Sequence, residues 1–298
     1  MNPIEYIDRL SGRLCKEEVY GGNHLEFLYG TTWLSRFCSP FLLRCIARNP
    51  LFSKLYGYVQ KLPASRSKIA PFIQTFGVDA TEFEKKPSEF VSFNDFFTRT
   101  LKPQARPIAA SAAVIPADGR YLFYQNISEA DGFVVKGKKF DLDELLQDRE
   151  LADLYREGSL VLARLCPSDY HRYHFPCDAV PEPSRAISGH LYSVNPIALK
   201  NRIEIFTENK RRLIVLNTTA FGKVTVVEVG ATCVGAIHET YTPSRSYRKG
   251  DEMGYFSFGG SSLVLLFPPR TILFDRDLQE ASRSHTEIRC LMGQSLGN

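Results

Sequence analysis

The sequence lacks the cysteine patterns that support disulfide frameworks and zinc sites. Its seven cysteines are an odd number, and no two of them are spaced as Cys-x-x-Cys. We therefore expect free thiols, a reducing compartment and no bound metal. A Walker loop and a Rossmann fingerprint are also absent from the sequence, which thus does not predict a bound nucleotide cofactor.

Acidic residues are missing from a long N-terminal stretch. Residues 27–78 contain no Asp or Glu but seven Lys and Arg, although the whole chain has a formal net charge of only +4. The uncharged runs in this stretch are far shorter than the roughly 18 residues of a membrane-spanning helix. Apolar side chains repeat there at helical spacing, namely Leu34, Phe37, Phe41, Leu42 and Ile46.

A basic amphipathic helix of this kind favours docking on an anionic membrane surface. The outer layer of a soluble domain gives the same pattern. Nucleic-acid binding is disfavoured, because large aliphatic residues separate the positive charges and no recognition motif is present. Acidic residues precede any apolar run at the N-terminus, so we expect no signal or transit peptide there.

The predicted secondary structure changes from helices to strands near residue 105. Residues 1–105 are predicted to be helical, with helices at 69–76 and 94–101 and Ser92 as the N-cap of the second. Short apolar runs then predict strands, at residues 121–124, 133–136, 160–165, 213–217, 223–229 and 263–267. An acidic helix is expected at 142–155, and the polar tail after Asp275 is expected to be loosely held.

We therefore predict an α+β fold. An N-terminal amphipathic helical layer, residues 1–105, is interpreted as a membrane-associating region. A mostly antiparallel β core, residues 106–298, is interpreted as the catalytic domain.

The motif Gly259-Gly260-Ser261-Ser262 runs directly into the apolar residues 263–267. Glycine at 260 leaves the carbonyl before Ser261 uncrowded and permits strained dihedral angles. The Ser261 hydroxyl can therefore attack the peptide bond that precedes it. An ordinary glycine-rich hairpin turn has the same pattern, so this motif alone does not decide the function.

Six motifs in a fixed order, between about residues 93 and 267, together resemble the phosphatidylserine decarboxylase family. They are Phe96-Phe97-Thr98-Arg99 ending in Arg106-Pro107-Ile108, then Pro116-Ala117-Asp118-Gly119, Tyr170-His171-Arg172-x-His174, Val234-Gly235-Ala236-Ile237, Lys249-Gly250-x-Glu252-x-Gly254-x-Phe256, and Gly260-Ser261. The commoner processing motif of the family is Leu-Gly-Ser-Thr, and here Ser262 keeps a hydroxyl at the place of Thr.

The resemblance implies a proenzyme that cuts itself between Gly260 and Ser261 into a β chain, residues 1–260, and an α chain, residues 261–298. Ser261 would attack the Gly260 carbonyl to give an ester, β-elimination would release the Gly260 carboxylate, and the dehydroalanine would hydrolyse to a pyruvoyl ketone. This pyruvoyl cofactor would form a Schiff base with the amine of phosphatidylserine. Loss of carbon dioxide would then give phosphatidylethanolamine, a step of phospholipid biosynthesis.

The same resemblance assigns roles to individual residues. Asp118, His174 and Ser261 would carry out the self-cleavage, because a hydroxyl needs a histidine oriented by a carboxylate to become nucleophilic. His171 is left for the decarboxylation, either as proton donor or as the anchor of the substrate carboxylate. Weaker candidates for substrate binding are His238, Tyr241 and Arg245, with Arg248 and Lys249 beside them.

Three alternative functions were weighed. A serine hydrolase acting on lipid esters needs Gly two residues after the nucleophile and a following helix, whereas Leu263 and a predicted strand follow Ser261. A pyruvoyl-dependent decarboxylase of a soluble amino acid does not explain the basic, apolar N-terminal region. An inactive lipid-binding homologue does not explain the simultaneous presence of the serine, both histidines and Asp118.

The expected partners follow from the preferred function. They are phosphatidylserine, an anionic membrane surface and, as an open alternative to a monomer, a second copy of the chain, with no nucleic acid. We expect the protein to lie peripherally on the cytoplasmic face of a bacterial-type inner membrane.

Overall fold

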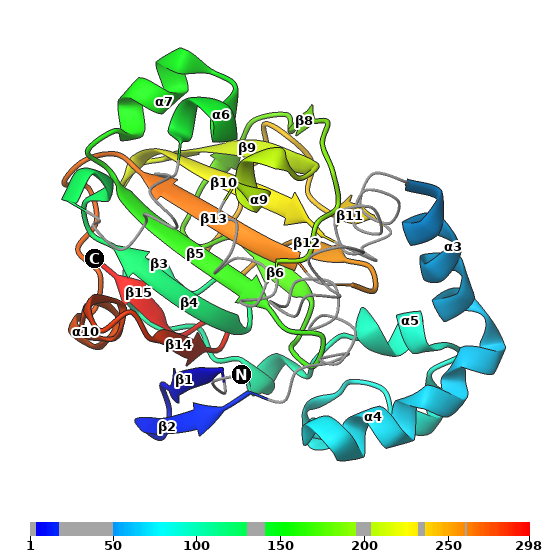
Figure 1. Cartoon of the computed structure of the whole chain (residues 1–298). Coiled ribbons are helices and arrows are strands. Elements are labelled where there is room, and N and C mark those ends of the chain that lie inside the picture. Colours follow the sequence, from blue (N-terminus) through cyan, green and yellow to red (C-terminus); the bar gives the residue numbers. More distant parts are fainter. Residues whose placement is uncertain (1–3, 18–49, 130–140, 195–203, 232–235, 260) are drawn as a thin grey trace, which may run out of the picture.

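The computed structural model describes residues 4–17, 50–129, 141–194, 204–231, 236–259 and 261–298 (Figure 1). A ten-stranded sheet forms the centre of the molecule. Its order is β2 (Arg13–Lys16), β1 (Glu5–Asp8), β14 (Glu287–Cys290), β4 (Gly119–Tyr124), β5 (Ser159–Leu165), β13 (Ser261–Phe267), β10 (Gly222–Gly230), β9 (Arg211–Thr218) and β7 (Val180–Pro181), with β8 (Arg185–Ile187) also paired to β9. Among the described strands of this sheet only β1 and β14 pair in parallel.

Two small sheets complete the β structure. One consists of β11 (Ile237–Glu239), β12 (Glu252–Phe256) and β6 (Arg172–His174), and the other of β3 (Ala113–Val114) and β15 (Ser295–Gly297). The strand β13 lies inside the large sheet and is buried on both faces, since its alternate residues enter two different hydrophobic clusters. Its apolar run therefore has no solvent-facing side, which explains why it does not alternate with polar residues.

Helices cover the sheet and extend beyond it. They are α3 (Pro50–Lys61), α4 (Ile69–Phe76), α5 (Phe93–Phe97), α6 (Leu142–Leu146), α7 (Arg149–Tyr155), α9 (Ile205–Glu208) and α10 (Arg276–Arg283), with short 3-10 helices at Pro63–Lys68, Ala80–Glu82, Pro87–Glu89, Pro103–Ala105 and Ile127–Glu129. Figure 1 shows α3, α4 and α5 together at one end of the molecule, to the right of the sheet. A cluster of phenylalanines holds this helical part together, with ring centroids 4.6–6.2 Å apart.

Most predicted elements of the β core are confirmed. The strands expected at 121–124, 160–165, 213–217, 223–229 and 263–267 correspond to β4, β5, β9, β10 and β13, and the helix expected at 69–76 is α4. Ser92 does cap α5, because its hydroxyl accepts a hydrogen bond from the Asp95 N–H, although α5 ends at Phe97 rather than at residue 101. The strand predicted at 133–136 and the apolar pattern at 34–46 lie outside the described residues.

Three expectations are wrong. Residues 5–16 were expected to be helical, but they form the hairpin of β1 and β2, which joins the edge of the large sheet through β14. The acidic helix expected at 142–155 is divided into α6 and α7, because Gln147 adopts a left-handed conformation and Asp148 caps a new helix. The tail after Asp275 is firmly held, since β14 lies between β1 and β4 and buries Ile288 and Cys290.

The described part of the chain contains no helix that is long and apolar enough to span a bilayer. Four cysteines fall within it, and all four are free thiols: Cys15, Cys166, Cys177 and Cys290. The same residues include no group of three His, Cys, Asp or Glu side chains placed to hold a metal ion.

Candidate active site

Ser261 is the first residue of β13 and is completely buried. It lies opposite Leu165 of β5 on one side and Gly230 of β10 on the other, so strands flank it on both sides. Gly260 is outside the described residues. Gly259, just before it, has a φ of 141°, a conformation that side chains rarely permit, so glycine is required at this entry to the strand.

His171 is the histidine that contacts Ser261. Its Nδ1 lies 3.4 Å from the Ser261 Oγ, and its Nε2 lies 2.9 Å from the main-chain oxygen of Cys166. A carbonyl oxygen can only accept, so Nε2 carries the proton and Nδ1 presents a lone pair to the serine hydroxyl. Complete burial lowers the pKa of His171 to about 3, with a smaller contribution from Arg99 in the same direction.

Helix α5 supports this pair from the side of the phenylalanine cluster. The ring of Phe97 stacks on the imidazole of His171, with centroids 3.9 Å apart. Asn94 accepts a hydrogen bond from the Phe258 N–H at 3.1 Å, and the ring of Phe258 also packs against Phe97. The helix thus holds both the histidine and the segment that leads into β13.

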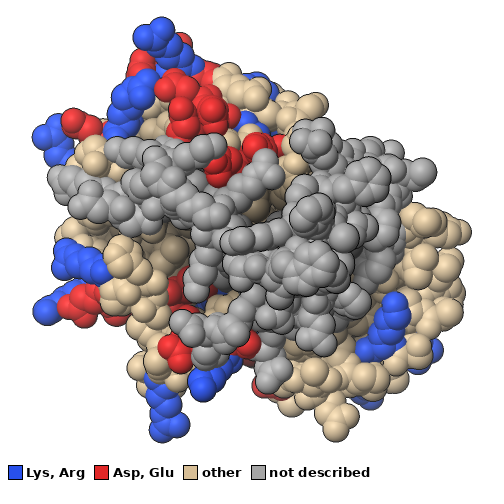
Figure 2. Space-filling model, viewed as in Figure 1, with Lys and Arg blue, Asp and Glu red and all other residues tan. Residues whose placement is uncertain are grey.

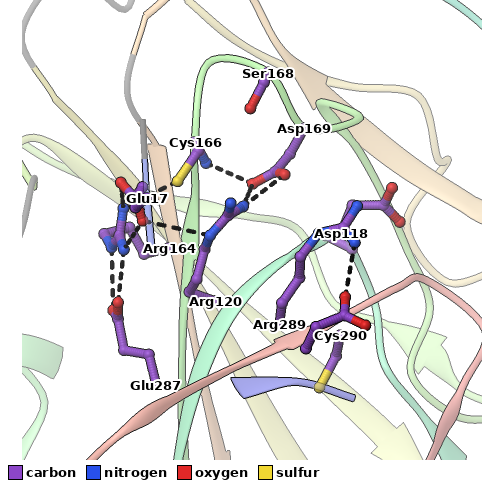
Figure 3. Close-up of polar contacts among 12 residues, drawn as sticks. Glu17, Asp118, Arg120, Arg164, Cys166, Ser168, Asp169, Glu287, Arg289 and Cys290 are labelled. Atoms are coloured by element: carbon purple, nitrogen blue, oxygen red, sulfur yellow. Dashed lines mark hydrogen bonds and ion pairs between the residues drawn. The ribbon is translucent and has the colours of Figure 1, made fainter. Parts of the chain in front are cut away.

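A buried network of ion pairs lies around Asp169, two residues before His171 in the sequence (Figure 3). Asp169 accepts two 2.7 Å hydrogen bonds from Arg120, which also lies 3.4 Å from Glu17. Arg164 binds Glu17 at 2.7 Å and Glu287 at 2.6 Å. The network therefore connects the loop before His171 to the end of the N-terminal hairpin and to β14.

His174 and Asp118 lie in different contacts from those expected. His174 Nδ1 is 2.9 Å from the Gly250 carbonyl oxygen, and its Nε2 is 3.4 Å from the Tyr170 hydroxyl. Burial lowers the pKa of His174, against opposing effects of the Gly250 carbonyl and of the negative charges nearby. The Asp118 carboxylate binds the Arg106 guanidinium, at 2.6 Å for the shortest contact, and accepts a hydrogen bond from the Met292 N–H.

The structure thus brings Ser261 together with His171 rather than with His174 and Asp118. Arg106 was part of a motif that the sequence displayed, but no pattern in the sequence indicated that it would pair with Asp118. Glu228 was missed entirely, because it lies in an apolar strand pattern. It is fully buried, and burial raises its pKa to about 8, against a smaller opposing effect of the Tyr173 hydroxyl.

The candidate substrate-binding residues are spread over a wider region. His238 lies on β11, 2.9 Å from the Ser257 hydroxyl, and its ring stacks on Tyr255. Tyr241 is buried in the core, whereas Arg245 is exposed on the loop before β12. The geometry therefore does not gather the three into one cluster of side chains.

Comparisons with known proteins agree with the sequence motifs. The sequence profile of the family described as phosphatidylserine decarboxylase matches residues 93–298. The phosphatidylserine decarboxylase proenzyme of Chlamydia pneumoniae is 48% identical over 299 residues, which cover 100% of this chain and 98% of the relative. The proenzyme of Chlamydia felis is 49% identical with the same coverage, and that of Chlamydia muridarum is 44% identical over 98% of this chain and 96% of its own. The chain therefore belongs to the phosphatidylserine decarboxylase family.

Proposed function

We propose that this member of the family converts phosphatidylserine to phosphatidylethanolamine and carbon dioxide by means of a pyruvoyl group that it makes from its own Ser261. The observation that supports this most directly is the buried Ser261 hydroxyl beside the unprotonated Nδ1 of His171. A ketone at position 261 would accept the electrons that a substrate carbon retains when carbon dioxide leaves it.

Self-cleavage begins with the transfer of the Ser261 hydroxyl proton to a base. The oxygen then attacks the carbonyl carbon of residue 260, the peptide C–N bond breaks, and the nitrogen of residue 261 takes up a proton. Elimination and hydrolysis then free the chain end of residue 260 and release ammonia from residue 261. Burial supports this sequence, since bulk water is kept from the ester before elimination.

Two assignments of the base follow from the sequence and the geometry. The sequence resemblance gives this role to His174 with Asp118. The contact of 3.4 Å supports His171, whose neutral imidazole already faces the hydroxyl. In either assignment His171 is beside residue 261 during the decarboxylation. There its Nδ1, after taking a proton from the ammonium group of the substrate, can deliver that proton to the substrate carbon or hold the substrate carboxylate.

A serine hydrolase is disfavoured by the local fold. The hydrolase elbow places the nucleophile on a turn that leads into a helix, whereas Ser261 leads into β13 in the centre of a sheet. Ser261 also lies within hydrogen-bonded strands rather than at an exposed turn. A soluble amino acid as substrate would give no role to a membrane-docking surface, and the helical part of the chain carries a candidate for such a surface.

We infer that α3 contributes to a membrane-docking surface. Leu55 and Tyr58 are each 61% exposed, and Val59 lies between them and the basic Lys61. Figure 2 shows mostly uncharged side chains with a few basic ones at the right edge of the molecule, where α3 and α4 lie, and a mixture of acidic and basic ones over α6 and α7 at the top. Lys61 contributes to the lowered pKa of His238, so the end of α3 lies near β11.

This surface supports the division of the chain into a membrane-associating part within residues 1–105 and a catalytic part at 106–298, apart from the hairpin at 5–16. It also supports a peripheral position on a membrane, which we propose to be the cytoplasmic face of the inner membrane. The double variant Leu55→Asp/Tyr58→Asp should bind anionic vesicles weakly and still cleave itself. Leu273→Asp, at a residue 65% exposed on the opposite side of the fold, is the control and should bind like the wild type. Equal binding by all three chains would remove α3 from the docking surface.

The pyruvoyl mechanism is tested by the intact mass of the purified chain. The wild type should give residues 1–260 and residues 261–298, the latter lighter by one ammonia than a product of simple hydrolysis. Ser261→Ala should remain one chain. Ser262→Ala is the matched control, because the Ser262 hydroxyl is also buried but has no hydrogen-bond partner in the described structure, and it should still be cleaved. An active wild type with a single intact mass would rule out the proposal.

A further inference from the structure

The orientation of His171 depends on the main-chain oxygen of Cys166, and the structure indicates what holds that oxygen. The Cys166 carbonyl accepts from the His171 Nε2–H at 2.9 Å and from the Asp169 N–H at 2.8 Å. The Asp169 carboxylate in turn accepts from the Cys166 N–H at 2.8 Å. Asp169 therefore binds Cys166 at both its N–H and its C=O, which fixes the direction of the carbonyl.

The carboxylate of Asp169 is itself held firmly. Arg120 donates to both of its oxygens, and the Asp169 side chain is 5% exposed. Arg120 is the leading cause that keeps the pKa of Asp169 below its usual range, although burial acts in the opposite direction. From the side of the phenylalanine cluster, Arg99 donates to the main-chain oxygens of Ser168 and Asp169 at 3.0 and 3.1 Å. Figure 3 shows Asp169 between Arg120 and Cys166.

We propose that Asp169, held by Arg120, is a positioning residue that acts through Cys166 to keep the proton of His171 on Nε2 and the Nδ1 lone pair directed at residue 261. The inference rests on the proposed function, since it gives His171 a role at that residue. Among the described residues, the Asp169 carboxylate is hydrogen-bonded to Arg120 and Cys166 and not to Ser261. Its effect should therefore appear only through His171.

Asp169→Asn tests this role. The amide keeps the size of the side chain, but only its oxygen can accept. The NH2 group faces either Arg120 Nη1 or the Cys166 N–H as a second donor, so the turn at Cys166 is held less firmly. A displacement of about 1 Å in a reacting group costs on the order of 10²-fold in rate. We expect kcat, normalised to the pyruvoyl content of the cleaved enzyme, to fall by about 10²-fold with KM unchanged. Asp275→Asn weakens one of the two carboxylate contacts of Arg9, the one at 2.8 Å, and should leave kcat unchanged.

A double-mutant cycle separates positioning from a general loss of structure. Self-cleavage and turnover are measured for wild type, Asp169→Asn, His171→Ala and the double variant. In the reaction that needs His171, adding Asp169→Asn to His171→Ala should change the rate by less than about threefold. A full additional loss in the double variant, or a wild-type kcat in Asp169→Asn, would overturn the inference.

If Asp169→Asn does not fold, Arg120→Lys provides the same cycle, because lysine keeps the charge but lacks the guanidinium whose Nη1 contacts both oxygens of Asp169. The same two results, a full additional loss in the double variant or a wild-type kcat in Arg120→Lys, would overturn the inference there. These measurements also distinguish a failure of the proposed function from a failure of the positioning role. A wild type that is active and uncleaved contradicts the pyruvoyl proposal, whereas a cleaved wild type with an unaffected Asp169→Asn contradicts only the positioning role.

Discussion

The neutral, buried state of His171 makes a quantitative prediction about stability. The pKa of this histidine is about 3 in the folded chain and about 6.5 in an unfolded one. Because the folded pKa is depressed, the stabilisation that this residue provides is complete above pH 6.5 and is lost as the pH falls toward 3. At pH 5 this histidine is mostly protonated in the unfolded chain and almost entirely neutral in the folded chain. At about 1.36 kcal/mol per pH unit, the loss between pH 7 and pH 5 is about 2 kcal/mol.

The perturbation is His171→Gln in a Ser261→Ala background, so that neither chain is cleaved. Unfolding free energies from urea titrations at pH 7 and pH 5 give the difference between the two chains at each pH. We expect this difference to shift by about 2 kcal/mol in favour of the glutamine variant at pH 5. His285→Gln, at an exposed histidine, controls for the substitution itself. A difference that stays constant between the two pH values would show that His171 is not held neutral, and the tautomer argument at Ser261 would fail with it.

Three further predictions concern other residues of the site. His174→Ala should accumulate uncleaved chain, as measured by intact mass. His171→Ala should still cleave itself but lose about 10²- to 10⁴-fold in the rate of decarboxylation, as measured by product analysis. The opposite result would make His171 the self-cleavage base. Glu228→Gln should raise the stability of the fold, because the raised pKa of the buried carboxyl makes the wild type less stable as the pH rises toward 8. The stability difference between variant and wild type should grow between pH 5 and pH 8 by at most about 1.4 kcal/mol per pH unit, and a difference independent of pH in thermal unfolding would contradict this. Asn94→Ala should cost about 1 kcal/mol in urea unfolding and slow self-cleavage, since the Phe258 N–H loses its acceptor, and an unchanged cleavage rate would show that this contact does not position the segment.

Much of the β core could be predicted from local patterns. The strands β4, β5, β9, β10 and β13 are continuous apolar runs, and such runs are typical of strands that are buried on both faces. The hairpin β1–β2 could not be predicted, because its short strands are partly exposed and its stabilising partner β14 is far away in the sequence. The C-terminal tail was misjudged from its polar composition, because its buried residues, such as Leu278, Ile288 and Leu296, are separated by polar ones and form no apolar run.

The candidate site was predictable as a set of residues but not as a set of contacts. Motifs identified Ser261, His171, His174 and Asp118, because the chemistry requires those residue types. Which histidine touches the serine depends on how β6 and the loop before it sit against the large sheet, and nothing in the spacing of the two histidines determines that. The arginine that binds Asp118 lies only 12 residues earlier, but nothing in the spacing of the two residues predicts that they pair.

The position of Ser261 at the start of an interior strand has a consequence for the life of the protein after cleavage. Residues 261–298 contribute β13 and β14, and each of these strands lies between two strands of the other fragment. The cut chain would therefore stay assembled as a tightly interlocked heterodimer, with no connecting peptide. Once such a molecule unfolds, its two pieces must find each other by diffusion, and refolding becomes dependent on concentration. Folding as a single chain would thus be possible only before the cut. The lifetime of the mature enzyme would then depend on a slow rate of unfolding, because refolding from two separate chains would be inefficient.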